Sequence, residues 1–234
     1  KRQYFNGNCY KYYFKDPNFK TLVLIHGLGL NQDVWTWLIS LFKNCNVLIY
    51  DLLGHGDSND PDDEISLALF ADQLSSIVNY LDIKRSILVG FSLGSMISRK
   101  FASVYPGNVE GLVLLNSPNR LLDHERDEIL KRARLLRDKG PESTTDAAIE
   151  RWFSNEFQQN NPHIVQLVRN WVNSNEKEVY SKIYPILYYG SIDLKLVNEN
   201  KPSLIITCDQ DFSNGPDAAK EIAKNFTKSD VCIL

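Results

Sequence analysis

The sequence lacks the features of a membrane protein or a nucleic-acid-binding protein. No apolar run in its 234 residues approaches the length that spans a bilayer, and residues 1–4, Lys-Arg-Gln-Tyr, carry no apolar segment of the signal-peptide kind. The net charge of −3 leaves no excess of positive charge to neutralise phosphates. We expect a cytoplasmic globular protein with no nucleic-acid or membrane partner, and the sequence gives no indication of its oligomeric state.

Cofactor motifs are missing as well. The four cysteines, at positions 9, 45, 208 and 232, have no C-x-x-C or other metal-ligand spacing, and three of them lie in or beside apolar runs. This pattern favours buried free thiols in a reducing compartment. The chain also has no clustered His and Cys set and no glycine fingerprint for a dinucleotide. We therefore expect no metal and no organic cofactor.

The first half of the chain alternates strand patterns with helix patterns. An N-terminal pair of aromatic runs around Asn6-Gly7-Asn8 is typical of a β-hairpin at a sheet edge. Buried-strand runs follow at 21–26, 46–50, 87–90 and 111–115, with helical spacing at 33–42 and 66–81 and after Ser92. The alternation predicts an α/β fold with a doubly wound, mostly parallel sheet.

The alternation of strand and helix patterns stops in the second half of the chain. Only helical patterns follow, at 125–139, 144–157, 162–173 and 177–189, before strand character returns at 203–207 and 230–234 around a helix at 216–226. We divide the chain into a first core part (1–118), a helical cap insertion (119–197) and a second core part (198–234). Because ligands bind at the carboxyl ends of parallel strands, the inserted helices would roof the pocket.

The stretch SILVGFSLGS, residues 86–95, predicts a sharp strand-to-helix turn centred on Ser92. Gly90 and Gly94 flank the serine because a Cβ at either position would collide with the neighbouring strand or helix. The turn would expose the Ser92 hydroxyl and aim the Leu93 amide at the same point. The alternative is a serine that only caps an ordinary helix.

The segment His26-Gly27-Leu28-Gly29 follows the first buried strand. Acyl-transfer chemistry needs backbone N–H groups there, and Leu28 would supply one oxyanion donor while Leu93 supplies the other. A plain glycine-rich turn explains this segment equally well. In the next strand-end loop, DLLGHGDS, we interpret His55 as a structural residue because no acidic partner is placed to make it a general base.

Four motifs in order, HGLG, DLLGHGDS, GFSLGS and SLIITCDQD, resemble those of the α/β-hydrolase superfamily. The insertion, at 133–157 and 180–193, is similar to the cap of 3-oxoadipate enol-lactonases and related carboxylesterases. The resemblance implies a Ser, acid, His triad in that chain order. The superfamily's Gly-x-x-Asp pattern selects Asp211 as the acid, although Cys208 stands where the glycine is usual. Asp209 and Asp123 are the alternatives.

The histidine of such a triad is not found after Asp211. The four histidines, at positions 26, 55, 124 and 163, all precede it. We expect the natural protein to continue beyond Leu234 with a histidine-bearing loop and one further helix, so that a chain ending at Leu234 is inactive. A catalytically dead, ligand-binding relative is one alternative, and a base recruited at His124 is another.

The predicted pocket is apolar and aromatic, with Trp35, Phe91 and Trp152 as walls and Arg151 as a partner for a substrate carboxylate. Ordinary core packing and an exposed arginine are the alternatives. The residues together predict a cofactor-independent serine hydrolase of a small ester or lactone, acting through an acyl-enzyme on Ser92. A perhydrolase or acyltransferase would share every motif and differ in what attacks the acyl-enzyme.

Overall fold

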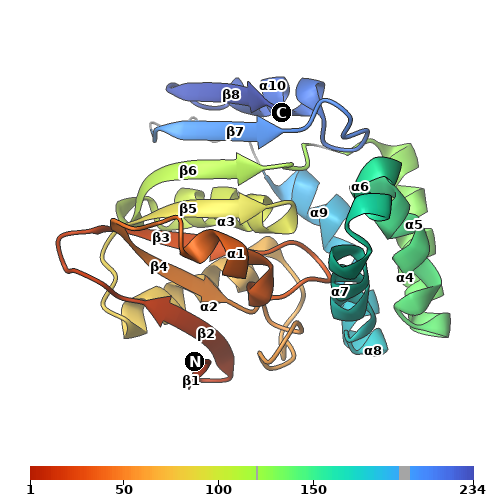
Figure 1. Ribbon diagram of the computed structural model, residues 1–234, viewed down its shortest axis with the longest axis horizontal. Helices are drawn as coiled ribbons and strands as arrows, with labels where there is room; N and C mark the ends of the chain where they lie inside the picture. Colours follow the sequence, from red (N-terminus) through yellow and green to blue (C-terminus); the bar gives the residue numbers. More distant parts are fainter. Residues whose placement is uncertain (120, 195–200) are drawn as a thin grey trace.

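A single mixed sheet runs through the part of the chain that the computed structural model describes, which is residues 1–119, 121–194 and 201–234 (Figure 1). The spatial order of the strands is β1-β2-β4-β3-β5-β6-β7-β8. Their bounds are β1 Gln3–Phe5, β2 Asn8–Tyr13, β3 Lys20–Ile25, β4 Cys45–Tyr50, β5 Ser86–Phe91, β6 Val109–Leu115, β7 Ser203–Thr207 and β8 Ser229–Ile233.

The N-terminal hairpin forms one edge of this sheet, which confirms the prediction. β1 and β2 are antiparallel and are joined by Asn6 and Gly7, both at positive φ (45° and 74°), as a tight primed turn requires. β2 pairs antiparallel with β4, and every later pairing is parallel. The predicted α/β class with a mostly parallel sheet is therefore confirmed.

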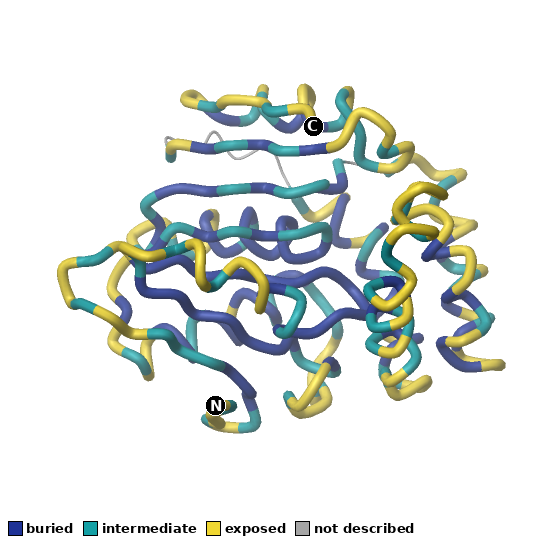
Figure 2. Tube along the Cα trace, viewed as in Figure 1, coloured by how far each residue is buried: buried dark blue, intermediate teal, exposed yellow. Residues whose placement is uncertain are grey.

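The central strands are buried on both faces, which explains their continuous apolar runs (Figure 2). Alternate residues point to opposite faces, so Val23 and Ile25 pack with the larger core while Leu22 and Leu24 pack with Trp35. The larger core includes residues of α2 (Leu67–Tyr80), α3 (Leu93–Val104) and α10 (Pro216–Ala223). The opposite face carries the 3-10 helix η1 (Gln32–Trp35) and α1 (Thr36–Ile39).

Six helices lie between β6 and β7 in the described part of the sequence. They are α4 (Asp123–Lys139), α5 (Glu142–Trp152), α6 (Asn155–Asn160), α7 (Pro162–Asn173), α8 (Lys177–Ile183) and α9 (Ile186–Asp193). Figure 1 shows α4 to α8 beyond the arrowheads of the parallel strands, at their carboxyl ends. We call residues 121–194 the helical segment. The boundary expected between 197 and 198 lies outside the described residues.

Two helices expected as single elements are each divided in two. Ser154 interrupts the predicted 144–157 helix, because its hydroxyl accepts a hydrogen bond from the Phe157 amide at 3.2 Å and caps α6. Pro185 divides the predicted 177–189 helix, since proline lacks the amide that would continue α8 and instead begins α9. Periodicity alone does not register these breaks, because the apolar spacing continues across them.

The described residues contain no helix that is long and apolar enough to cross a bilayer. They also contain no group of three or more His, Cys, Asp or Glu side chains arranged to hold a metal ion. All four cysteines are free thiols, as expected, but only Cys9 is buried and Cys208 is exposed. The expectation of buried thiols was wrong for Cys208, because that residue follows the last residue of β7, where the chain leaves the sheet.

Candidate active site

Ser92 occupies a strained position between β5 and α3. Its backbone angles, φ 51° and ψ −112°, lie in a region that residues with a side chain rarely adopt. The Ser92 amide donates to the carbonyl of Leu115 on the neighbouring strand at 2.9 Å, and its carbonyl accepts from the Ser95 amide at 3.0 Å. The serine therefore joins the sheet directly to the first turn of α3.

The two flanking glycines permit this turn. A Cβ on Gly94 would lie less than 3.0 Å from the carbonyl oxygen of Ile25 on β3, and a Cβ on Gly90 would lie equally close to the Gly94 backbone. Both obstacles are backbone atoms, which cannot rotate away. A side chain at either glycine would therefore collide with the neighbouring strand or helix, as predicted from the sequence.

Leu28 and Leu93 reach the surroundings of Ser92 from two different parts of the chain. Leu28 lies in the loop after β3 and lines a cavity together with Ser92, while Leu93 is the first residue of α3. Neither backbone amide donates any of the hydrogen bonds found among the described residues. Two unused N–H groups at such a place can stabilise a negatively charged oxygen.

Two buried histidines fix the loop that contains Leu28. His55 Nε2 accepts a hydrogen bond from the Gly29 amide, and His26 Nε2 accepts one from the Leu52 amide, each at 3.0 Å. Each Nδ1 therefore carries the proton and donates to a carbonyl, that of Leu53 or Gly27 respectively. Burial lowers the pKa of His26 to about 4 and that of His55 to about 3, so both rings are neutral near pH 7.

The Asp211 carboxylate is held by three hydrogen bonds in the loop after β7. One oxygen accepts the amides of Ser213 and Asn214, both at 2.9 Å. The other accepts Nδ2 of Asn116 at 2.7 Å. Asn116 follows the last residue of β6 and has a positive φ of 44°. The orientation of this carboxylate is thus fixed by both its own loop and the adjacent strand end.

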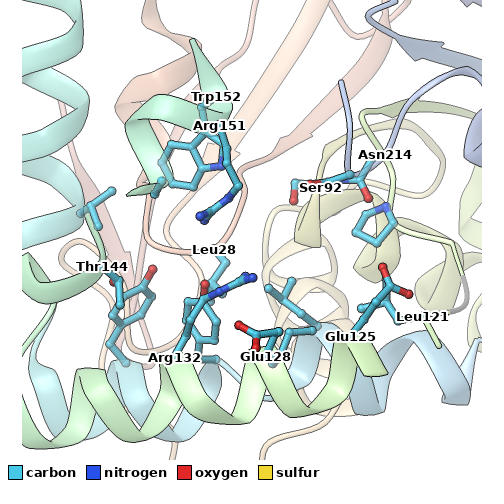
Figure 3. Close-up of a pocket in the computed structure, with 18 of the residues that line it drawn as sticks. Leu28, Ser92, Leu121, Glu125, Glu128, Arg132, Thr144, Arg151, Trp152 and Asn214 are labelled. Atoms are coloured by element: carbon cyan, nitrogen blue, oxygen red, sulfur yellow. The ribbon is translucent and has the colours of Figure 1, made fainter. Parts of the chain in front are cut away.

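Ser92 lines two cavities, the first of which is shown in Figure 3. The first has a volume of about 280 Å³ and lies between Leu28, Ser92 and helices α4, α5, α8 and α9. The second has a volume of about 500 Å³ and brings Ser92 together with Asp211 and Asn116. Arg151 and Trp152 line both cavities. The strained serine therefore lines both cavities.

The two remaining residues predicted to wall the pocket, Phe91 and Trp35, lie at different places in the structure. Phe91 lines the second cavity only, and Trp35 lines neither, because it is buried at 4% exposure against the sheet with Leu22 and Leu24. The Trp35 side chain packs against the sheet instead of facing the cavities. This placement contradicts the prediction that Trp35 walls these cavities.

The structure also shows where the alternative candidates for the acid and the base lie. Asp209 lines the second cavity, whereas Asp123 begins α4 and accepts a hydrogen bond from the Tyr188 hydroxyl at 2.8 Å. His124 lines the first cavity together with Ser92. His163 is exposed on α7 and lines neither cavity.

Two residues of the site were missed by sequence reasoning. Asn116 could have been found, because a polar residue directly after a buried strand lies at the same sheet edge as Ser92 and Asp211. Arg132 lines the first cavity from the middle of α4, and no local pattern distinguishes it from the other basic residues of that helix.

Comparisons with known proteins agree with this architecture. The family model described as alpha/beta hydrolase fold matches residues 20–234. The 3-oxoadipate enol-lactonase 2 of Acinetobacter baylyi is 24% identical over 199 residues, which are 85% of this chain and 74% of that protein. The enol-lactonase structure from Burkholderia xenovorans superposes with a TM-score of 0.88 at 22% identity, covering 100% of this chain and 91% of that one.

A third relative has a higher sequence identity to this chain, but over a shorter stretch. An uncharacterized protein of Mycobacterium tuberculosis is 36% identical over 97 residues, which are 41% of this chain and only 28% of that protein's length. The family model, in contrast, spans both core parts and the helical segment, and the sheet order and the strained serine turn fit it. The chain belongs to the α/β-hydrolase fold family.

Proposed function

We propose that this protein is a serine hydrolase that cleaves a small carboxylic ester or lactone through an acyl-enzyme on Ser92. The Ser92 hydroxyl attacks the substrate carbonyl, and the Leu28 and Leu93 amides stabilise the resulting oxyanion. A histidine takes the serine proton and gives it to the leaving oxygen, and Asp211 orients that histidine. Water then attacks the acyl-enzyme while the histidine takes a proton from it, and the histidine gives that proton to the Ser92 oxygen as the acid leaves.

The strained backbone of Ser92 is the single observation that carries this proposal. A φ of 51° at a non-glycine residue costs free energy, and here it coincides with two cavities, two unused amides and an oriented carboxylate. The two enol-lactonases named above support a lactone or ester as the substrate class. We further propose that the helical segment serves as the cap that roofs the pocket.

The mechanism also needs a base, which must be a histidine other than His26 and His55. His26 and His55 use both ring nitrogens on backbone groups, and burial lowers the pKa of each well below neutrality. We propose that the base is a histidine following Leu234 in the natural protein. His124 is the alternative within this sequence, because it lines the first cavity with Ser92.

The test compares the natural full-length protein with its Ser92→Ala variant on p-nitrophenyl acetate. We expect kcat/KM to fall by about a thousandfold or more, as happens when the nucleophile of a triad is removed. Mass spectrometry of the acid-quenched wild type should find the acetyl group on the peptide that contains Ser92. Ser103→Ala, an exposed serine on the same helix, is the matched control and should keep full activity.

Unchanged turnover in Ser92→Ala would overturn the assignment. A His124→Ala variant separates the two bases, because it should remain active if the base follows Leu234 and lose activity if His124 is recruited. Comparing water, peroxide and alcohols as acceptors distinguishes a hydrolase from a perhydrolase or acyltransferase. Binding of esters without any turnover would instead indicate a ligand-binding relative.

A further inference from the structure

Two guanidinium groups point into the first cavity (Figure 3). Arg132 reaches it from α4 and Arg151 from the end of α5, and Ser92 lines the same space. Among the described residues, neither arginine forms an ion pair or a hydrogen bond. A cavity of about 280 Å³ therefore contains two positive charges without partners of their own.

The acidic groups of the same cavity are already occupied. The Glu125 carboxylate accepts the Leu122 amide at 2.7 Å and so caps the first turn of α4. Glu128 is paired with Lys131 at 3.9 Å along the helix surface. Among the residues that the structure describes, neither glutamate forms an ion pair or a hydrogen bond with Arg132 or Arg151.

The surroundings of Arg151 favour an anion beside it. Burial lowers the pKa of Arg151, and the nearby charge of Arg132 lowers it as well, which shows that the two cations are close enough to repel each other. Tyr184 and Tyr180 line the same cavity and raise the pKa of Arg151, Tyr184 by more than Arg132 lowers it and Tyr180 by less. An anion placed between the arginines would remove this repulsion.

We propose that the substrate carries a carboxylate, distant from its scissile carbonyl, that binds between Arg132 and Arg151 while Ser92 faces the carbonyl. This inference rests on the proposed function and narrows its substrate class to acidic esters or lactones. Arginine suits the role because its planar fork can make two parallel hydrogen bonds to one carboxylate. The small cavity volume, near the lower end for ligand sites, fits a short dicarboxylic half-ester better than a long acyl chain.

The experiment measures binding in a Ser92→Ala background, so that it does not depend on turnover. The probes are the monomethyl esters of linear dicarboxylic acids from succinic to suberic acid, each compared with its neutral dimethyl ester by calorimetry. We expect at least one monomethyl ester to bind tighter than its dimethyl ester. Arg151→Gln and Arg132→Gln should each weaken that binding by about tenfold, the usual cost of one hydrogen bond to a charged group.

The dimethyl esters and a third arginine provide the controls. Both cavity variants should leave the affinity of the dimethyl ester unchanged. Arg134→Gln, an exposed arginine on α4 that does not line the cavity, should bind both esters as the parent does. Equal affinity of acid and neutral esters in the parent, no binding of any monomethyl ester, or an equal loss in Arg134→Gln would overturn the proposal.

If the carboxylate site is correct but the serine chemistry is not, binding will discriminate the esters while full-length protein with Ser92 intact hydrolyses neither. If the serine chemistry is correct but the carboxylate site is not, the protein will hydrolyse both esters with equal kcat/KM. The two proposals therefore fail in different ways.

Discussion

Ser92 shows how a single residue can combine an unfavourable backbone conformation with a place in the lining of two cavities. Its φ of 51° is maintained because β5 and α3 fix the chain on both sides and because the Leu115 carbonyl binds its amide. The close approach of α3 to β3 depends in turn on Gly94, which sits against the Ile25 carbonyl. The backbone geometry at Ser92 therefore depends on Gly94 as well as on Ser92 itself.

Replacing Gly94 with alanine should destabilise the protein, although alanine is the better helix former. The new Cβ would collide with the Ile25 carbonyl oxygen, and we expect the free energy of unfolding to fall by about 3 kcal/mol. Urea denaturation measures this change. Gly107→Ala is the control, because no heavy atom lies within 4 Å of the Cβ position there, and it should shift stability by less than about 0.5 kcal/mol. A stabilised Gly94→Ala protein would contradict the packing argument.

At the scale of secondary-structure elements, the rings of His26 and His55 hold together the loops after β3 and β4. The ring centroids are 5.4 Å apart, and each ring connects a backbone amide to a backbone carbonyl. Both connections need a neutral ring, because a protonated Nε2 could no longer accept a hydrogen bond. The position of the Leu28 amide is therefore linked to the protonation state of these two residues.

This linkage predicts a pH-dependent stability. The folded pKa values, about 4 for His26 and about 3 for His55, lie below the value of 6.5 expected in the unfolded chain. The unfolded state thus binds more protons below about pH 6.5, and the free energy of unfolding should fall as the pH decreases toward 4. Between pH 7 and pH 5 we expect a loss of about 2 kcal/mol for each histidine. Urea denaturation at a series of pH values measures it.

Two variants identify the source of this pH dependence. His55→Gln should lower stability at pH 7 but reduce the loss between pH 7 and pH 5, since one of the two buried rings is gone. His163→Gln removes an exposed ring and should leave the pH dependence unchanged. A pH dependence that is the same in the wild type and in His55→Gln would contradict the assignment.

At the scale of the whole molecule, the helical segment is attached to the core through the same Leu28 loop. Leu30 belongs to an apolar cluster with Ile149, Val165, Val168 and Val172 of α5 and α7. Asn175 donates from its side chain to the Gly29 carbonyl at 3.0 Å and also to the last carbonyls of α7. The Tyr180 hydroxyl would be only 2.5 Å from a Cβ at Gly29. One short loop therefore contacts both the serine turn and the helices over it.

Replacing Asn175 with alanine should loosen this attachment. The Gly29 carbonyl and the end of α7 would lose their side-chain donor, and we expect a stability loss of about 1 kcal/mol, typical of one hydrogen bond. Hydrogen exchange should become faster in α7 and α8 but not in the sheet. Asn170→Ala, which removes an exposed side chain that accepts a hydrogen bond from the exposed Gln166, should leave exchange unchanged. Faster exchange in the central strands alone would contradict the assignment of Asn175 to this contact.

Sequence patterns predicted the strands, a mostly parallel sheet and the sharp turn at Ser92, because each depends on local features. β-branched runs fix β3, β5 and β7, and the Gly-x-Ser-x-Gly spacing fixes the turn around Ser92. The ends of the helices were predicted less accurately from the sequence. The break at Ser154 depends on one hydroxyl that caps α6, and the break at Pro185 depends on one missing backbone N–H. These are single-residue effects that a periodic pattern does not record.

The sequence by itself determined the mostly parallel sheet, the fold family and the residue at the tip of the strand-to-helix turn, because strand patterns and glycine positions are properties of neighbouring residues. Only the tertiary structure decided that Asn116 holds Asp211, that Trp35 turns into the core and that Arg132 joins Arg151 in one cavity. Those relationships join residues far apart in the chain or on separate helices. Their side-chain directions follow from packing between elements, which no local spacing specifies.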